Sequence, residues 1–339
     1  MIVHVAVPVP GLGLLTYRVP SGIPRPVVGA RVVVPLGNRI VTGIVMDDAP
    51  ASTVDDAAIK PIKELMDTDA FVPADVVELA RWTAEYYAAG PGDTITAVLP
   101  PMARGGRTDA HKTIRVAAIT AAGLEAVHDP EKVALRDTQV DALRLLAGVP
   151  AGISTPELAA RGIAADAVAR LAKKGFVSLR ADRVDRDPFE AAAAKGIEID
   201  LARTLTQEQE SALARLRGFA DARTFQVALL HGVTGSGKTE IYLRLAAAVR
   251  DGGRRALVLV PEIALTPVVT SFFRDAFRDR VAIQHSGLSD GERHDQWQRI
   301  RRGDVDVVIG TRSAVFAPLE DVGLIVVDEE HDGSYKQEE

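Results

Sequence analysis

One glycine-rich segment of this chain has the residue types needed to hold a triphosphate. Residues 232–239 read Gly-Val-Thr-Gly-Ser-Gly-Lys-Thr and fit the pattern G-x-x-x-x-G-K-[ST] at every fixed position. Glycines let backbone N–H groups turn inward around phosphates, the lysine reaches the β- and γ-phosphates, and the final hydroxyl binds Mg²⁺. A chance glycine-rich turn is the alternative, but an apolar strand pattern (227–230) precedes the segment and an amphipathic helical pattern follows it. The predicted nucleotide-binding residues are Gly232, Thr234, Gly235, Ser236, Gly237, Lys238 and Thr239.

A second segment, residues 324–331, is an apolar run that ends in acids, Leu-Ile-Val-Val-Asp-Glu-Glu-His. The carboxyl ends of parallel strands meet at one edge of a sheet, which would bring these carboxylates beside the glycine-rich turn. With Lys238 they form the predicted catalytic set: Asp328 would hold Mg²⁺ together with Thr239, Glu329 would polarise an attacking water, and His331 would sense the γ-phosphate. Alone, a solvated strand end explains the acids equally well; the glycine-rich segment about 90 residues upstream favours catalysis.

The segment 205–209, Leu-Thr-Gln-Glu-Gln, lies shortly before the glycine-rich turn. The amide of Gln209 could make a two-point contact with adenine, because it offers both a donor and an acceptor. The alternative is a helix N-terminus capped by Thr206. The two interpretations are compatible, and both stay open.

Two further segments, 260–266 and 310–314, each follow a predicted strand. Strand ends in a parallel sheet share one edge, so both segments would lie on the same side as the nucleotide. Hydroxyls of Thr266 and Thr311, backbone N–H groups and the Arg312 guanidinium suit a sugar–phosphate track. Taken singly, each segment is only a loop.

The elements that must position these residues alternate between strand and helix from residue 205 onward. The predicted strands are 225–230, 255–260, 281–285, 305–309 and 324–328, and the predicted helices are 239–250, 267–277 and 290–302. Such alternation predicts a parallel sheet with right-handed crossovers.

The earlier part of the chain has a different pattern. Residues 1–100 hold short β-branched runs broken by Pro and Gly, which predicts a small β-barrel or sandwich, followed by a helix over 73–89 with Trp82 on its buried side. Residues 112–184 run from a strand through helices to a strand, an order that favours a winged helix over another small α/β domain. Residues 101–110 and 185–203 are expected to be connectors.

Composition narrows the function classes. The chain has 339 residues, 47% of them hydrophobic and 25% charged, and no apolar run reaches membrane-spanning length. It has no cysteine, which excludes disulfides, Cys-ligated zinc, iron–sulfur clusters and thiol catalysis from these residues. No secretory leader is visible, so the expected location is the cytoplasm. The net charge of −6 does not suggest a strongly basic nucleic-acid binder, although a local basic surface is compatible with it.

Taken together, the motifs resemble those of superfamily 2 DEAH-type helicases, and more closely the PriA family of bacterial replication-restart helicases (primosomal protein N′). The segments that carry this resemblance are "GVTGSGKTEIYL" (232–243), "LVPEIALTP" (259–267), "HSGLSDGER" (285–293), "GTRSAVFAP" (310–318) and "DEEHDGSYKQEE" (328–339), with "HVAVPVP" (4–10) and "RVVVPLGNR" (31–39) near the start.

The resemblance implies a multidomain protein with a small β-rich N-terminal domain, a winged-helix-like α/β domain and a RecA-like P-loop helicase lobe built on a parallel sheet. The corresponding boundaries are 1–104 (3′-DNA-binding), 110–184 (winged-helix-like), 185–203 (linker) and 204–339 (helicase lobe 1). The implied cofactors are ATP and Mg²⁺. Zinc is expected in the longer family proteins, whereas these residues offer it no cysteine.

The resemblance also implies DNA contacts near both ends of the sequence. Tyr17, Leu36 and Gly37 match positions that hold the 3′ end of a strand, although Thr16 and Leu36 depart from the acid and the aromatic that the family often has there. Tyr17 either stacks on a base or belongs to the core. Tyr335 and Lys336 match the start of a DNA-responsive aromatic-rich loop.

The expected activity is that of an ATP-dependent DNA helicase of replication restart. It would bind forked, branched or single-stranded DNA, move 3′–5′, and work with primosome proteins and single-stranded DNA-binding protein near the nucleoid. With lobe 1 alone, these 339 residues are expected to bind nucleotide and DNA without unwinding. The alternatives are a non-catalytic fork-binding module with a vestigial nucleotide site, and a P-loop ATPase with no nucleic-acid role.

Overall fold

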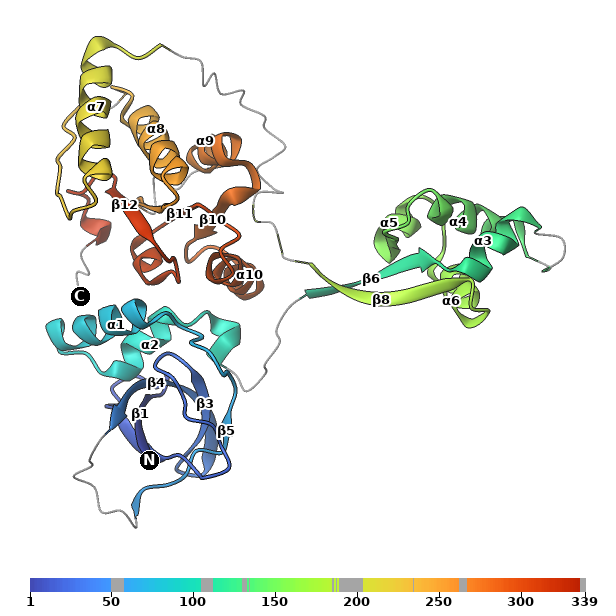
Figure 1. Ribbon diagram of the computed structural model, residues 1–339, viewed down its shortest axis with the longest axis horizontal. Helices are drawn as coiled ribbons and strands as arrows, with labels where there is room; N and C mark the ends of the chain where they lie inside the picture. The colour runs from blue at the N-terminus through green and yellow to red at the C-terminus, as the bar shows by residue number, and fades with distance from the viewer. Residues whose placement is uncertain are drawn as a thin grey trace. The chain divides into compact units, whose positions relative to one another are not determined.

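The computed structural model describes residues 1–49, 58–104, 112–129, 133, 135–184, 186, 188, 204–233, 235–261 and 267–335. The chain divides into two compact units (Figure 1). One unit comprises Met1–Ala110 together with Arg186–Glu339, and the other comprises His111–Asp185. Of the expected connector over 185–203, only Arg186 and Pro188 lie within the described residues.

The N-terminal part of the first unit is a five-stranded antiparallel sheet in the order β2-β1-β4-β3-β5. Its strands are β1 (Ile2–Ala6), β2 (Leu15–Arg18), β3 (Arg31–Leu36), β4 (Arg39–Ala49) and β5 (Glu64–Leu65). A bridge between Arg18 and Pro61 joins β2 to the segment that leads into β5, so the sheet closes on itself. The β-rich domain is therefore a small barrel, and its interior is filled by alternate valines of the strands.

Two helices cover one side of this barrel, α1 (Ala74–Tyr86) and α2 (Pro91–Val98), and the short 3₁₀ helix η2 (Pro101–Arg104) follows. Their apolar residues pack with Phe71, whose ring stacks on Trp297 with centroids 4.6 Å apart. Trp297 belongs to the later segment of the same unit, residues 186–339, so the barrel domain and that segment share a buried core.

The second part of the first unit is a four-stranded sheet in the order β10-β11-β9-β12, with every neighbouring pair parallel. Its strands are β9 (Arg255–Leu259), β10 (Val281–Gln284), β11 (Val307–Gly310) and β12 (Val322–Val327). The helices are α7 (Gln207–Asp221), α8 (Lys238–Asp251), α9 (Pro267–Phe277) and α10 (Asp290–Arg301). The expected parallel α/β lobe is confirmed.

The two faces of this sheet have different covers. Side chains of α8 and α9 pack on Ala256, Val258, Ile283 and other residues of one face. Ile300 of α10 and the 3₁₀ helix η5 (Arg312–Phe316) pack on Leu257, Leu259, Ala282 and Val308 of the opposite face. Helices on both faces explain why the strands are almost continuously apolar rather than alternating.

One predicted strand of the lobe is wrong. Residues 225–230 form no strand in the structure, and Phe225, Val227 and Leu229 are 92%, 82% and 78% exposed. A β-rich sequence is stabilised as a strand only when a neighbour completes its hydrogen-bond ladder, and here the segment pairs with none of the described strands. As a result β12 is an edge strand, with Ile325 and Val327 exposed.

The second unit is a mixed α/β domain. A three-stranded antiparallel sheet in the order β7-β6-β8 contains β6 (Lys112–Ile119), β7 (Ile153–Ser154) and β8 (Val177–Val184). Helices α3 (Ala121–His128), α4 (Asp137–Ala147), α5 (Thr155–Ala160) and α6 (Ala165–Lys173) complete it. The mixed α/β class is confirmed, and the finer winged-helix assignment stays a prediction. Across the described parts of both units, every helix is too short or too polar to cross a membrane.

Candidate nucleotide site and nucleic-acid contacts

The glycine-rich turn leads directly into α8. Gly235 and Gly237 have φ values of +81° and +84°, the left-handed region in which residues with a Cβ are strained. Gly237 is the N-cap of α8, and a Cβ there would lie 2.4 Å from Nε2 of Gln209. The glycines of the sequence pattern therefore stand at positions where the backbone conformation requires glycine. Thr234 lies outside the described residues.

Lys238 connects the two predicted motifs. Its Nζ donates a hydrogen bond to the carbonyl oxygen of Gly232 at 2.8 Å and lies 3.4 Å from Oε1 of Glu329. The half-buried amine thus lies between the glycine-rich turn and the acidic end of β12. Thr239 follows in the first turn of α8. A hydroxyl and carboxylates beside a lysine are suitable partners for a triphosphate and a hard cation.

Asp328 is fixed from two sides. Its backbone N–H donates to Leu259 at 2.9 Å, which continues the pairing of β12 with β9, and its Oδ1 accepts a hydrogen bond from the Tyr242 hydroxyl at 3.1 Å. The Tyr335 hydroxyl donates to the Asp328 carbonyl at 2.8 Å. Burial, with the Asp328 carboxylate next in importance, raises the pKa of Tyr242, so this phenol remains a neutral donor.

The sequence reasoning missed Tyr242. The signal was available, because Tyr242 stands four residues after Lys238 in a helix, and such positions share a face. A phenol on the face that carries the lysine was a candidate to contact the acidic strand end.

Glu329 and His331 leave β12 through a tight turn. Glu329 has a φ of +46°, a costly conformation for a residue other than glycine. Nε2 of His331 lies 3.8 Å from Oε2 of Glu329, and its Nδ1 lies 3.4 Å from Oε2 of Glu330. The imidazole is exposed and surrounded by carboxylates, so its predicted sensing role stays a prediction.

Gln209 completes the capping box of α7, whose N-cap is Thr206, and also contacts the glycine-rich turn. Its Oε1 accepts from the Thr206 N–H at 3.0 Å, and its own N–H donates to Thr206 Oγ1 at 3.3 Å. Its Nε2 donates to the Ser236 carbonyl at 2.8 Å. The cap predicted as the alternative is present, and contact with adenine stays a prediction, which would require the amide to exchange these partners.

Only some of the residues predicted to contact a nucleic-acid backbone are found together in the structure. Leu259 pairs with both Gly310 and Val327, so β9, β11 and β12 end at one edge of the sheet. Thr311 follows β11 and is buried, whereas Arg312 beside it is exposed. Thr266 and Lys336 lie outside the described residues.

The three predicted contacts in the barrel domain differ in accessibility. Tyr17 is 4% exposed, and its hydroxyl donates to the Pro35 carbonyl at 2.9 Å. Burial raises the pKa of this phenol. The structure supports the core alternative for Tyr17 and contradicts base stacking, because the ring is enclosed. Leu36 packs against the same core, and Gly37 is exposed in the turn between β3 and β4 with a φ of +57°.

The exposed aromatic surface of the barrel domain lies on α1 instead. Trp82 is 54% exposed and stacks on Tyr86 with ring centroids 5.0 Å apart. The prediction that Trp82 faces the core is therefore wrong. The buried face of α1 consists of residues such as Val76, Val77 and Ala80, which face the barrel. These residues alone account for the helical periodicity of the sequence.

Comparison with known families agrees with this geometry. Residues 4–100 match the family described as "3′DNA-binding domain (3′BD)", and residues 206–339 match "DEAD/DEAH box helicase". The chain is thus a 3′ DNA-binding domain and a DEAD/DEAH helicase domain in one polypeptide.

Relatives extend the match along the whole sequence. The chain is 31% identical to the "Replication restart protein PriA" of Bacillus subtilis, over 95% of this chain and 48% of that protein. It is 33% identical to that of Haemophilus influenzae, over 100% of this chain and 45% of that protein, and 44% identical to that of Synechocystis over 51% of this chain and 20% of that protein. The chain belongs to the PriA replication restart family, as the resemblance predicted. It spans less than half the length of these relatives.

Proposed function

We propose that these 339 residues bind DNA and hydrolyse ATP as part of an ATP-dependent replication-restart helicase that moves 3′–5′. The observation that carries the proposal is the place of Lys238 Nζ, 2.8 Å from the Gly232 carbonyl and 3.4 Å from the Glu329 carboxylate. A cation between a phosphate-binding turn and a candidate general base is the arrangement that phosphoryl transfer to water needs.

The domain assignment is part of this proposal. Residues 1–104 would bind DNA, 110–184 would form a winged-helix-like domain, 185–203 would link, and 204–339 would be helicase lobe 1. The family matches at residues 4–100 and 206–339 support the first and last of these.

The ion pair between Lys238 and Glu329 has a chemical consequence. When Lys238 moves to the phosphates of a bound nucleotide, Glu329 loses this partner and becomes free to accept a proton from water. Nucleotide binding would thus activate the base. Thr239 and Asp328 would hold Mg²⁺, since both offer the oxygen ligands that this ion prefers. When bound, the ion neutralises charge on the β- and γ-phosphates.

The proposed partners follow from the family. They are forked, branched and single-stranded DNA, other primosome proteins and single-stranded DNA-binding protein, in the cytoplasm near the nucleoid. The support is the family match to a 3′ DNA-binding domain and the name of the relatives, "Replication restart protein PriA".

The test is nucleotide binding and DNA-stimulated ATPase activity of the 339 residues. We expect Mg·ATP to bind, hydrolysis to be slow, and no unwinding. Lys238→Ala should remove nucleotide binding, and unchanged ATP affinity in that variant would refute the phosphate-binding assignment. Turnover near that of a working motor would refute the expectation of slow hydrolysis.

One observation favours a second candidate, a fork-binding module whose nucleotide site is vestigial. The segment 225–230, just before the glycine-rich turn, is exposed rather than built into the sheet. Affinity for forked against duplex DNA, measured with and without Mg·ATP, separates the two. A fork preference that nucleotide leaves unchanged, in a chain that binds no ATP, would favour the module.

A further inference from the structure

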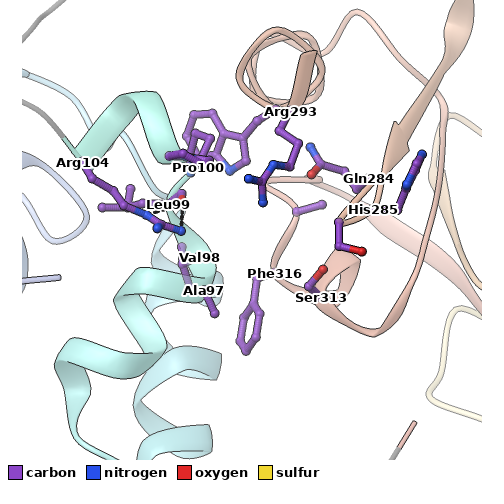
Figure 2. A pocket seen from close by; sticks show the side chains of 14 residues that line it. Ala97, Val98, Leu99, Pro100, Arg104, Gln284, His285, Arg293, Ser313 and Phe316 are labelled. Carbon is purple, nitrogen blue, oxygen red and sulfur yellow. Dashed lines mark hydrogen bonds between the residues drawn. The ribbon is translucent and has the colours of Figure 1, made fainter. Parts of the chain in front are cut away.

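A pocket of about 180 Å³ lies where the barrel domain meets the helicase lobe within the first unit. Leu99, Pro100 and Arg104, from the end of α2 and η2, line it from one side (Figure 2). Gln284, His285, Arg293 and Ser313, from β10, α10 and η5, line it from the other. A single water needs only about 10–15 Å³ of such space, so a group of several heavy atoms fits.

The walls of this pocket contain hydrogen-bond donors that have no acceptor. Nε2 of Gln284, Nε of Arg293 and Nε1 of Trp297 are buried and, within the described part of the chain, have no hydrogen-bond partner. A buried donor without a partner is unfavourable, and natural proteins pair nearly all of them. Since all three atoms are donors, the occupant that would satisfy them is an acceptor.

The charge of the pocket also favours an occupant that accepts hydrogen bonds. The Arg104 guanidinium donates to the carbonyls of Thr96 and Leu99, and among the described residues no carboxylate pairs with it. Arg293 is paired with Asp290 at 2.6 Å. Burial and then the neighbouring Arg293 lower the pKa of Arg104, and Asp290 offsets this in part. Two guanidinium groups against one carboxylate leave a positive excess that an anion would neutralise.

We propose that this pocket binds a phosphate group through Arg104 of the barrel domain and Arg293 of the helicase lobe, with the Ser313 hydroxyl as a further donor. Paired guanidinium groups suit phosphate because each presents several N–H donors to its oxygens. Ser313 belongs to η5, directly after Arg312, the exposed one of the predicted backbone contacts there. The phosphate is therefore one of a DNA strand that passes from Arg312 into the pocket. This assignment rests on the proposed DNA-binding function.

The decisive variant is Arg293→Gln, with Arg293→Lys as its charge-preserving partner. The control is Arg217→Gln, which removes one exposed arginine from α7, outside the pocket. The affinity for a fluorescent single-stranded oligonucleotide is measured between about 50 and 200 mM salt. Loss of one phosphate contact lowers the slope of log affinity against log salt by about 0.7. The loss of DNA affinity caused by Arg293→Gln should therefore become about 2.6-fold smaller between the lowest and the highest salt concentration. Arg293→Lys should keep most of the slope.

A second measurement distinguishes the two sources of phosphate. In a Lys238→Ala background, which removes the glycine-rich turn as a competing site, inorganic phosphate should raise the melting temperature, and adding Arg293→Gln should abolish that rise. If Arg293→Gln abolishes the rise in melting temperature but leaves the salt dependence of DNA affinity unchanged, the pocket is a phosphate site. In that case the proposal that the phosphate belongs to the DNA backbone is overturned. If Arg293→Gln matches Arg217→Gln in both measurements, the site is refuted.

The inference and the proposed function can fail separately. Arg293→Gln should leave ATP binding at Lys238 intact, because the pocket and the glycine-rich turn share no lining residue. Failure of the unaltered chain to bind ATP would refute the proposed function and leave the phosphate measurements valid.

Discussion

The Tyr242 hydroxyl donates a hydrogen bond to Oδ1 of Asp328 at 3.1 Å, and this bond joins α8 to the end of β12. The helix that begins at the glycine-rich turn therefore also orients the carboxylate proposed to hold Mg²⁺. Tyr242 acts through Asp328 and is a positioning residue.

Tyr242→Phe should weaken Mg²⁺ affinity about tenfold, as the loss of a partner that orients a metal ligand commonly does. The measurement is the Mg²⁺ dependence of nucleotide binding. Tyr86→Phe is the matched control, because that phenol is exposed on α1. Equal Mg²⁺ midpoints for the two variants would contradict the positioning role.

Trp297→Ala should destabilise the first unit by about 3–5 kcal/mol, because a buried aromatic is lost and leaves a cavity. Trp297 is 3% exposed and stacks on Phe71, which Arg31 covers with its guanidinium carbon 3.7 Å from the ring centroid. Urea unfolding is the measurement.

The control for that experiment is Trp82→Ala, which removes an exposed indole and should cost about 1 kcal/mol or less. Similar costs for the two tryptophans would mean that the barrel domain and the helicase lobe do not share the buried core described above.

Gly237→Ala should destabilise the chain by about 1–2 kcal/mol, because its left-handed φ is unfavourable for a residue with a Cβ. The added methyl would also displace the Gln209 amide, so nucleotide affinity should fall. Thermal unfolding and nucleotide titration are the measurements.

For Gly218→Ala, in the same lobe, we expect the opposite effect on stability. A Cβ at Gly218 meets nothing within 4 Å, and the residue lies inside α7, so alanine should stabilise by about 0.5–1 kcal/mol. Nucleotide affinity should not change. Destabilisation by both substitutions would show that glycine conformation is not the cause.

The start of α10 should be sensitive to acid. The Ser289 hydroxyl donates to Oε2 of Glu292 at 2.6 Å, and this bond, with a second from the Ser289 N–H, lowers the pKa of Glu292. A lowered pKa in the folded state stabilises the fold above the unfolded value of about 4.3, and this contribution is lost as pH falls through the folded-state pKa.

Glu292→Gln should therefore cost about 0.5–1 kcal/mol near neutral pH, as other charged groups at helix N-termini do, and much less near pH 3. Unfolding free energies of the two proteins at both pH values provide the comparison. A difference that does not vary with pH would assign the effect to shape rather than charge.

Local sequence determined the chemistry-bearing segments. The glycine-rich turn and the Asp328–His331 segment that follows β12 were identifiable because each function needs particular residue types at fixed short spacing. The parallel lobe was predictable for a similar reason, since alternating apolar strands and amphipathic helices can bury their faces in few ways. The family followed from the order of these motifs.

Only the tertiary structure decided which residues of separate elements meet. It enclosed Tyr17, left Trp82 outside, kept residues 225–230 out of the sheet, and brought Tyr242 to Asp328 and Arg104 to the pocket of Arg293. Periodicity defines the faces of an element but not its partner. The partner depends on the packing of residues far apart in the chain, and short-range patterns contain no information about it.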